Sequence, residues 1–357
     1  MGALDRNVYD LVRQNKMTLS QYLEQEMPAP EGSKLDAYQY QLKDAGIYTK
    51  AVPEKGIYAS EVEKFFTTEH SRVLFPEYIA RQIREAISED TMLPYLIGIQ
   101  TPLEGDTYRS FYVDDQPGSQ RKKRVTESAE LPRAKITKRE QAVRLYKYGR
   151  AIEASYEFIR RVQIDMLALH VQRIAIEASK DKVSEIITTI EDGDGNDNAA
   201  DVLEQRDLDS GATDDGQITA KGFIRFLMEY EEFPCDTIIA DKDSFIQLVL
   251  TNVPSLSTTD LVKLLATGTT VGVNLNAPQM PTGTIRLFWH DDVGANKVMG
   301  ISRANAIEEI KEVGSDINEA DKFITRQTSV LTISENIGYS KLFKEATKIL
   351  DFETGAS

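Results

Sequence analysis

The feature that most constrains this chain is a run of 43 residues, from Arg150 to Asp192, that contains neither glycine nor proline. Its apolar residues recur mostly at steps of three, four or seven, which is the periodicity of a helix. They are Ile159, Val162, Met166, Leu169, Ile176, Val183, Ile187 and Ile190. Ser155 supplies a starting signal. We expect a helix of about 35 residues, roughly 50 Å long, which exceeds a small domain and needs cover from several neighbouring elements.

The segment before this helix, residues 101–151, is expected to form an extended two-stranded flap. Residues 107–113 (TYRSFYV) are rich in aromatic residues with partial alternation, which indicates a strand. Residues 115–133 contain a Pro-Gly pair and a second proline and therefore form the loop tip, and residues 134–148 suit the returning strand. An isolated two-stranded ribbon is marginally stable in water. We therefore expect the flap to lie on another surface.

Charge is divided unevenly along the chain. Residues 101–150 hold 12 Lys and Arg against 7 Asp and Glu, a net charge of +5, whereas the whole chain carries −15 and the remainder −20. A basic flap on an acidic body favours docking on a neighbouring acidic surface, the alternative being a solvated charge run. The candidate contact residues are Arg121, Lys122, Lys123, Arg124, Arg133 and Lys135. The cluster at 121–124 could also contact nucleic acid or act as a localisation signal, although it lacks interleaved aromatic residues for base stacking.

The N-terminal part is divided into an arm and a first helical unit. Residues 1–66 alternate short helical patches with breakers and are expected to form a peripheral arm with little core of its own. Residues 67–100 contain a predicted helix with Ile79, Ile83 and Ile87 on one face. Together with residues 152–205 they would form one domain around the long helix. We expect no secretory leader and no membrane-spanning segment, because no apolar run is long enough.

The C-terminal part indicates a second, smaller unit. After an acidic, glycine-rich loop, helical and strand patterns alternate in residues 206–296, which predicts a small α/β domain. Residues 297–357 are expected to supply return strands to the first domain, including a strand over 322–333. The segment 339–350 is predicted to be a final helix.

Candidate catalytic and metal-binding residues are sparse. Asp192–Asn196 resembles the start of a calcium loop, but Asp197 and Leu203 stand where an EF-hand needs its glycine and glutamate. His290-Asp291-Asp292 could bind a cation, although a surface loop is the simpler interpretation. We expect Cys235 to be an inert core thiol and His170 to be packed or paired. No zinc, phosphate-loop or nucleophile-elbow motif is present, and we expect no cofactor, no metal and no enzymatic activity.

The order of these parts resembles the major capsid protein of tailed phages, the Hong Kong 97-like fold that encapsulin shells share. Residues 153–190 with the trailing Asp-Gly-Asp-Gly are similar to the spine helix of that family and the turn after it. Residues 107–148 stand in the place of its extended loop. The segment 277–283 (APQMPTG), followed by strands at 298–302 and 323–333, is similar to its late strand region. The resemblance spans about residues 65–350 and rests on the order of elements.

The resemblance implies an α+β capsid fold with an N-terminal arm, an extended β-hairpin loop, a long spine helix in a peripheral domain and a small axial α/β domain. It implies a subunit that assembles into hexamers and pentamers of an icosahedral phage head around double-stranded DNA. Such a protein is assembled in the host cytoplasm, becomes part of the virion and has itself as main partner, with scaffold, portal and decoration proteins as further ones. DNA would be contacted only non-specifically.

Some members of the family crosslink subunits through a lysine and an asparagine. Lys122 and Lys123 lie on the corresponding part of the flap, but no matching asparagine is identifiable, so we predict no crosslink. Two other functions stay open at this stage. One is an encapsulin-like compartment shell, and the other is a soluble metal-dependent enzyme that uses the acidic loops.

Overall fold

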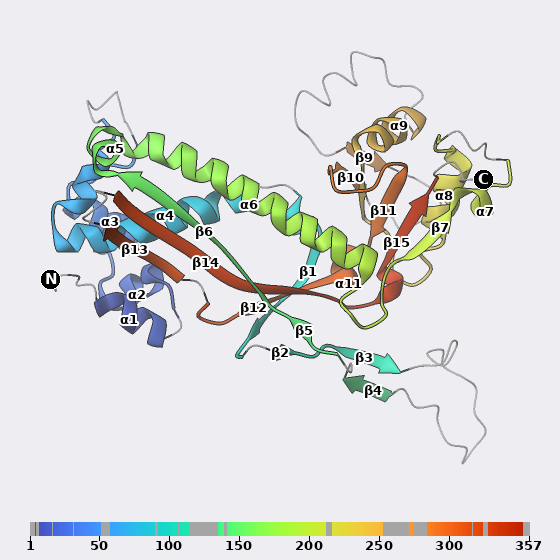
Figure 1. Cartoon of the computed structure of the whole chain (residues 1–357), viewed down its shortest axis with the longest axis horizontal. Coiled ribbons are helices and arrows are strands. Elements are labelled where there is room, and N and C mark those ends of the chain that lie inside the picture. Colours follow the sequence, from blue (N-terminus) through green and yellow to red (C-terminus); the bar gives the residue numbers. More distant parts are fainter. Residues whose placement is uncertain are drawn as a thin grey trace.

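Two β-sheets lie in different parts of an elongated molecule, and one long helix, α6, runs along the first sheet toward the second (Figure 1). The computed structural model describes residues 4, 7–15, 17–30, 32–50, 58–89, 92–105, 107–114, 135–138, 141–211, 216–252, 271–274, 284–315, 317–323 and 328–352. Helices and strands both contribute to the cores, so the α+β class expected from the sequence is confirmed.

The helices are α1 (Asn7–Gln14), α2 (Leu19–Glu26), α3 (Ala37–Asp44), η2 (Val62–Phe66), α4 (Glu69–Glu89), η3 (Leu93–Tyr95), α5 (Tyr156–Arg161), α6 (Ile164–Asp192), α7 (Gln205–Leu208), α8 (Ala220–Met228), α9 (Lys242–Asn252), α11 (Arg303–Ala306) and η4 (Lys344–Ala346). The strands are β1 (Ile97–Leu103), β2 (Thr107–Tyr108), β3 (Phe111–Asp114), β4 (Lys135–Lys138), β5 (Val143–Arg144), β6 (Tyr146–Ser155), β7 (Asp201–Glu204), β8 (Thr237–Ala240), β9 (Val271–Asn274), β10 (Thr284–Trp289), β11 (Lys297–Ile301), β12 (Ile307–Glu312), β13 (Ile317–Phe323), β14 (Thr328–Lys341) and β15 (Thr347–Asp351).

The long helix begins later than the sequence predicts. Ser155 caps only α5, which has 6 residues. The chain then turns extended, because the carbonyl of Val162 accepts the N–H of Val62 at 3.0 Å and the N–H of Ile164 donates to the carbonyl of Ser60 at 2.9 Å. These bonds to an earlier segment replace the helical ones at this point. The expected helix of about 35 residues is therefore divided, and α6 itself has 29 residues.

The buried face of α6 also differs from the predicted stripe in its first half. Met166, Leu169 and Ile176 are 52%, 62% and 48% exposed. The buried apolar residues there are Ile164, Leu167, Val171 and Ala175. The prediction assumed one continuous helix through Val162. Because α6 begins anew after the break at residues 162–163, the predicted apolar stripe faces away from the core in this half. In the second half Val183, Ile187 and Ile190 are buried, as predicted.

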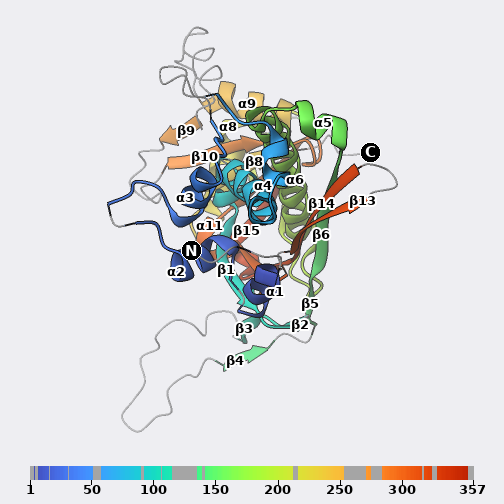
Figure 2. The same cartoon turned by 90° about the vertical axis from the view of Figure 1, so that its left-hand side faces the viewer.

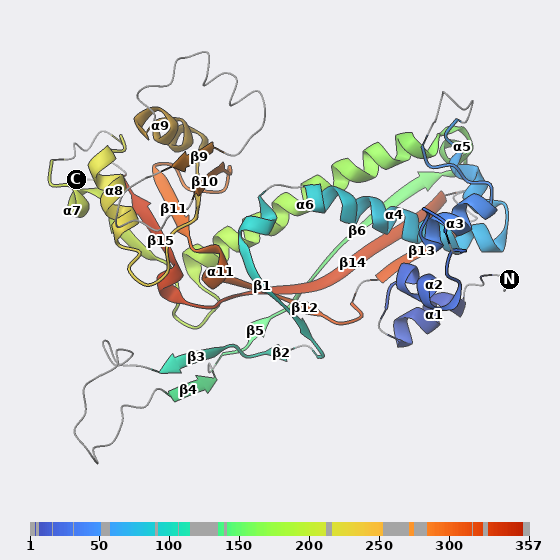
Figure 3. The ribbon, with the colours of Figure 1, turned by 180° about the vertical axis from the view of Figure 1, so that it is seen from behind.

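Strand β14 is the centre of the five-stranded sheet. Residues Thr328–Ile337 pair antiparallel with β6 along one edge. Along the other edge β14 pairs with β13 and then with β12, and β1 extends the sheet in parallel to β12. The single strand predicted over 322–333 thus corresponds to the end of β13 and the beginning of β14, which are antiparallel. Helices α4 and α6 pack beside each other along this sheet (Figures 2 and 3).

The six-stranded sheet has the order β7-β15-β11-β8-β10-β9 and belongs to the smaller α/β part of the chain. Strand β8, with all four residues buried, lies between β11 and β10. Helices α8 and α9, both predicted, pack their apolar faces on this sheet. Strands β11 and β15 come from residues 297–357, which the sequence analysis assigned to the other domain.

The predicted C-terminal helix over 339–350 is wrong. This segment contains the end of β14, the short turn η4 and β15. Its apolar residues follow a helical spacing, but β15 pairs with β11 on one side and β7 on the other. That position buries Ile349 and Leu350 to 3% and 0% exposure. The strand lies between two others in its sheet, so pairing on both sides and burial outweigh the local spacing.

The N-terminal helices share a core with the first half of α6. Helices α1, α2 and α3 bury their apolar side chains against η2, α4 and α6. Leu19, Leu23 and Tyr38 are nearly inaccessible, and each buried leucine of this kind contributes about 1.5–3 kcal/mol. The segment expected to be an arm with little core of its own is therefore packed on the body of the same chain.

Candidate functional site

A thin β-ribbon leaves the body below the five-stranded sheet (Figure 1). Its strands pair as β2 with β5 and as β3 with β4, in antiparallel register. This is the extended flap predicted from the sequence. Of the six predicted contact residues, Arg121, Lys122, Lys123, Arg124 and Arg133 lie outside the described residues. Lys135 begins β4, where its Cα is paired with that of Asp114.

The root of the ribbon is fastened to the body by a buried carboxylate. Glu308 on β12 is 4% exposed. It accepts a hydrogen bond from the hydroxyl of Tyr108 at 2.8 Å and another from the hydroxyl of Thr101. Burial, the hydrogen bond and the charge of Glu308 raise the pKa of Tyr108. The tyrosine therefore stays protonated and keeps donating to the carboxylate.

Two further contacts hold the returning strand. The N–H of Gln141 donates to the side-chain oxygen of Asn196 at 3.2 Å, which links the ribbon to the loop after α6. Strand β5 also crosses closely over β14 at Gly338, where an added Cβ would lie 2.8 Å from the carbonyl oxygen of Arg144. Glycine is required there by this close approach of two backbones. The base of the ribbon is thus fixed, while its strands extend away from the body.

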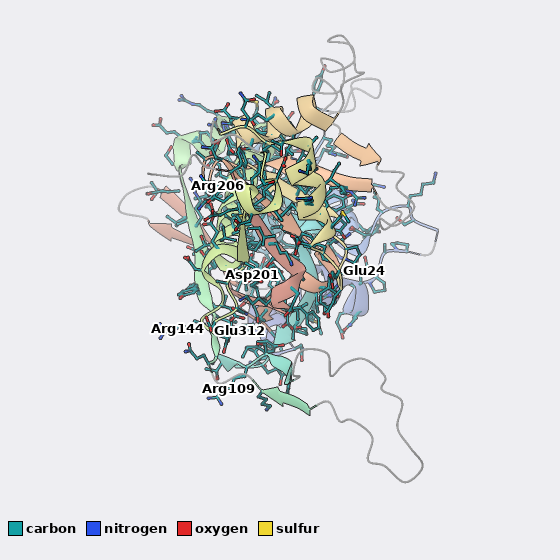
Figure 4. All side chains as sticks on the ribbon, turned by 90° about the vertical axis from the view of Figure 1, so that its right-hand side faces the viewer. Glu24, Arg109, Arg144, Asp201, Arg206 and Glu312 are labelled. Atoms are coloured by element: carbon teal, nitrogen blue, oxygen red, sulfur yellow. The ribbon has the colours of Figure 1, made fainter. Side chains whose placement is uncertain are left out.

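Basic and aromatic side chains are exposed along the described part of the ribbon and on the first two residues of β6, which pair with β14. Phe111 and Tyr146 are 57% and 52% exposed. The exposed basic residues are Arg109, Lys138, Arg144 and Lys147. Among the described residues, no carboxylate forms an ion pair with any of these four. Lys138 lies over the ring of Phe111, 5.6 Å from its centre. Figure 4 shows Arg109 and Arg144 at this lower end of the molecule. We call these six residues the ribbon strip.

The ribbon strip was not predicted from the sequence, where the run of four cations at 121–124 was the stronger signal. The signal that could have found the strip is the spacing of two in Arg109 with Phe111 and in Arg144 with Tyr146, because side chains two apart lie on one face of a strand.

A group of four charges ties the long helix to the first sheet. It lines a cleft of about 570 Å³ that is bordered by α4, β1, β12 and β14. The ammonium of Lys182 on α6 lies 2.6 Å from one carboxylate oxygen of Glu335, and that of Lys311 lies 3.3 Å from the other. Glu309 completes the group and accepts hydrogen bonds from Gln100 at 3.1 Å and Tyr339 at 3.4 Å.

The two carboxylates of this group have opposite pKa shifts. Burial raises the pKa of Glu309 above its ordinary value, although Lys182 counteracts it. Burial also acts on Glu335, but the charges and hydrogen bonds of Lys182 and Lys311 outweigh it and lower that pKa. The ion pairs of Glu335 with Lys182 and Lys311 therefore cross-link α6 to the sheet.

The loop considered for calcium is a structural lock. The carboxylate of Asp194 accepts hydrogen bonds from the hydroxyl of Ser340 at 2.9 Å, the N–H of Lys341 at 3.1 Å and the side-chain amide of Asn196 at 2.9 Å. Burial tends to raise the pKa of Asp194, but these hydrogen bonds lower it overall. The loop therefore joins the end of α6 to β14. Gly193, with φ of +82°, ends the helix.

The remaining candidate residues are also engaged or buried. Asp291 lies 2.7 Å from the ammonium of Lys242, so its charge is balanced. Burial raises the pKa of Cys235 to about 12, in agreement with an inert core thiol. His170 is exposed and has no hydrogen-bond or ion-pair partner among the described residues, so the prediction of a packed or paired histidine is wrong. Within the described part of the chain, no three His, Cys, Asp or Glu residues gather as a metal site. No described helix combines the length and apolar character that crossing a bilayer requires.

Comparisons with known proteins identify similar structures at low sequence identity. No protein-family model and no curated protein sequence matches the chain. The structure is similar to the satellite phage P4 procapsid (10% identity, TM-score 0.49, covering 81% of this chain and 100% of that one). It is also similar to a virus-like particle from Pyrococcus furiosus (11%, TM-score 0.46, 77% and 98%) and to an encapsulin complex from Synechococcus elongatus (13%, TM-score 0.47, 71% and 85%). These TM-scores are below 0.5, so we base the functional proposal on the chain's own elements.

Proposed function

We propose that this chain is a non-enzymatic shell subunit, the major capsid protein of a tailed phage. Copies of it would assemble into hexamers and pentamers of an icosahedral head that encloses double-stranded DNA. The main partner is the chain itself, with scaffold, portal and decoration proteins as additional partners. The protein would be assembled in the host cytoplasm and then reside in the virion.

The observation that carries this proposal is the ribbon. Among the described residues its four short strands pair only with one another. The ribbon strip, which continues onto the first two residues of β6, exposes two aromatic rings and four basic side chains without a described carboxylate partner. A two-stranded ribbon of this kind does not stabilise itself in water. A covering surface supplied by another copy would complete it. The buried root at Glu308 supports this interpretation, because it presents the ribbon in a defined direction.

The energetics favour many modest contacts over one strong contact. Exposed ion pairs contribute only about 0–1 kcal/mol each. Apolar contacts of the ribbon and the long helix would therefore supply most of the cohesion, and charges would select the register. Each subunit in a closed shell is held by several neighbours at once, so weak individual contacts add up to a stable assembly.

Particle size and content test the proposal. Purified full-length protein should form closed shells of megadalton size, seen by negative-stain microscopy and by sedimentation. Particles isolated from cells that carry the complete phage genome should protect double-stranded DNA from nuclease. A protein that stays a monomer or small oligomer under all assembly conditions would contradict the proposal. Shells that contain a packaged protein and no DNA would instead identify an encapsulin-like compartment.

A further inference from the structure

Helix α8 exposes an apolar and acidic face at the end of the molecule that carries the six-stranded sheet. Its inward side is buried through Phe223, Phe226 and Leu227. On its outward side, Ile224 and Met228 are 41% and 64% exposed, one helical turn apart. Three exposed carboxylates follow directly: Glu229, Glu231 and Glu232. These two apolar and three acidic residues are called the α8 face below.

The acidic character of the α8 face is not cancelled by the cations of the same helix. Lys221 lies 2.7 Å from the carboxylate of Asp209. Arg225 donates to the backbone carbonyl of Leu208. Both cations are thus turned toward α7 and the loop after it. Among the described residues, none forms an ion pair with Glu229, Glu231 or Glu232, so the face combines exposed apolar area with unbalanced negative charge.

The ribbon strip has the opposite character. It combines the rings of Phe111 and Tyr146 with four exposed cations that have no described carboxylate partner. The two surfaces are complementary. The aromatic rings of the strip can pack on the apolar residues of α8, and the basic groups can lie beside its carboxylates. Figure 4 views the molecule from the end that carries α8, with Arg109 and Arg144 of the ribbon strip below it.

An exposed apolar stripe on α6 fits the ribbon less well than the α8 face. Met166, Leu169 and Ile176 form a stripe on the outside of α6. Arg173 and Lys180 are exposed on the same helix, but so are Glu177, which lies 3.7 Å from Arg173, and Asp181. The charges beside this stripe are therefore mixed, and the stripe does not offer a basic ribbon the unbalanced negative charge of the α8 face.

We propose that the ribbon strip of one subunit docks on the α8 face of a second copy. This inference rests on the proposed function and names the acceptor surface for the ribbon. Donor and acceptor are different parts of the chain, so the contact is head-to-tail. A head-to-tail contact that closes on itself produces a ring, as hexamers and pentamers require. The ribbon and α8 would therefore form the contact that repeats around each ring.

Charge exchange in the full-length protein tests this contact. The ribbon variant carries Arg109→Glu with Arg144→Glu, and the acceptor variant carries Glu229→Lys with Glu232→Lys. Each should lower the assembled fraction, measured by sedimentation, by about tenfold or more, because like charges now face each other. The variant with all four changes should recover assembly. Lys34→Glu with Lys43→Glu, an equal charge change at exposed residues of the N-terminal region, should assemble like the unchanged protein.

Mixing the two single-surface variants gives a sharper result. The ribbon variant has a reversed ribbon and an unchanged acceptor, and the acceptor variant has the opposite combination. Every ribbon therefore meets an acceptor of opposite charge only if the two proteins alternate around the ring. Even-membered rings can alternate and should form. Five-membered rings cannot, so the mixture should yield hexamers without closed shells.

The outcomes separate the inference from the proposed function. If the acceptor variant assembles normally while the ribbon variant does not, the ribbon docks elsewhere and the α8 inference is wrong. The same conclusion follows if circular dichroism shows that both variants are folded, but neither the variant with all four changes nor the mixture assembles. If nuclease treatment abolishes assembly, nucleic acid is the partner of the ribbon. An unchanged protein that never assembles would overturn the proposed function itself.

Discussion

The hydroxyl of Tyr108 donates a hydrogen bond to the buried carboxylate of Glu308 across 2.8 Å, at the point where the ribbon leaves the body. Tyr108→Phe removes this donor and leaves Thr101 as the other hydroxyl donor to the same carboxylate oxygen. We expect local opening of the ribbon root to become easier by about 1–2 kcal/mol. Hydrogen exchange of amides 107–114 should accelerate. Tyr146→Phe, at an exposed tyrosine, is the control and should leave this exchange unchanged.

Gly338 marks a close approach of the ribbon to the central strand β14. In Gly338→Ala the new Cβ would lie 2.8 Å from the carbonyl oxygen of Arg144, so one backbone has to shift. We expect a loss of about 1–3 kcal/mol in the free energy of unfolding, measured by chemical denaturation. Gly211→Ala is a suitable control, because its nearest atom would lie at an ordinary 3.6 Å. Equal stability of both variants would show that the crossing is looser than described.

Glu309 is expected to make stability decrease at higher pH. Burial raises its folded-state pKa, so the folded protein binds this proton more tightly than the unfolded chain does. Its contribution to stability is fully present below the unfolded pKa of about 4.3 and is lost as the pH rises through the folded value. Glu309→Gln should therefore be more stable than the unchanged protein at pH 8.

At pH 4 the Glu309→Gln variant and the unchanged protein should have similar free energies of unfolding. Urea denaturation at both pH values measures the difference. Glu26→Gln, an exposed carboxylate on α2, should show no such pH-dependent gain. A Glu309→Gln variant that is less stable at pH 8 would mean that the ionised carboxylate is needed by Lys182 and Lys311.

Lys182 and Glu335 should show the opposite pH dependence. The folded-state pKa of Glu335 is lowered, because the two lysines outweigh the effect of burial. The stability from Glu335 is present above about 4.3 and is lost as the pH falls through the lower folded value. Lys182→Met should cost about 2–3 kcal/mol at pH 7, and this cost should shrink in acid. Lys180→Met, at an exposed position of the same helix, should be close to neutral in chemical denaturation.

The tip of the ribbon is expected to affect assembly and not folding. Reversing Arg121, Lys122, Lys123 and Arg124 to glutamate should leave the thermal unfolding of the subunit unchanged. The yield of closed particles should fall by about tenfold, because the reversed tip would repel an acidic neighbour. Microscopy and sedimentation measure the yield. Normal particles from this variant would show that the tip does not dock on a neighbour through its charges.

Local pattern predicted the elements of the small α/β part. The helices around residues 218–232 and 242–250 and the strand at 237–240 form where the periodicity places them. The apolar faces of the two helices pack in one core with this strand, so the local spacing agrees with the burial. The two strands of the flap were also predictable, since aromatic residues and turn-forming residues mark them clearly.

Contacts between distant segments decided what the pattern could not. Residues 60–62 divide the long helix at Val162 through backbone hydrogen bonds, and nothing in residues 150–192 signals this. The segment 339–350 has a helical spacing, but its last part forms β15, which pairs with β7 and β11 in the sheet. The ribbon strip became visible only once exposure and pairing were known.

A long helix, a basic flap and a small α/β part could be predicted from the order of residues alone, because periodicity, charge and turn residues are local properties. The packing of the N-terminal helices on the chain's own body and the hydrogen bonds of Glu308 to the ribbon root could not. The acidic, apolar face of α8 likewise became evident only in the folded chain. These features depend on which distant residues share a core or remain uncovered, and that is set by the packing of the whole chain.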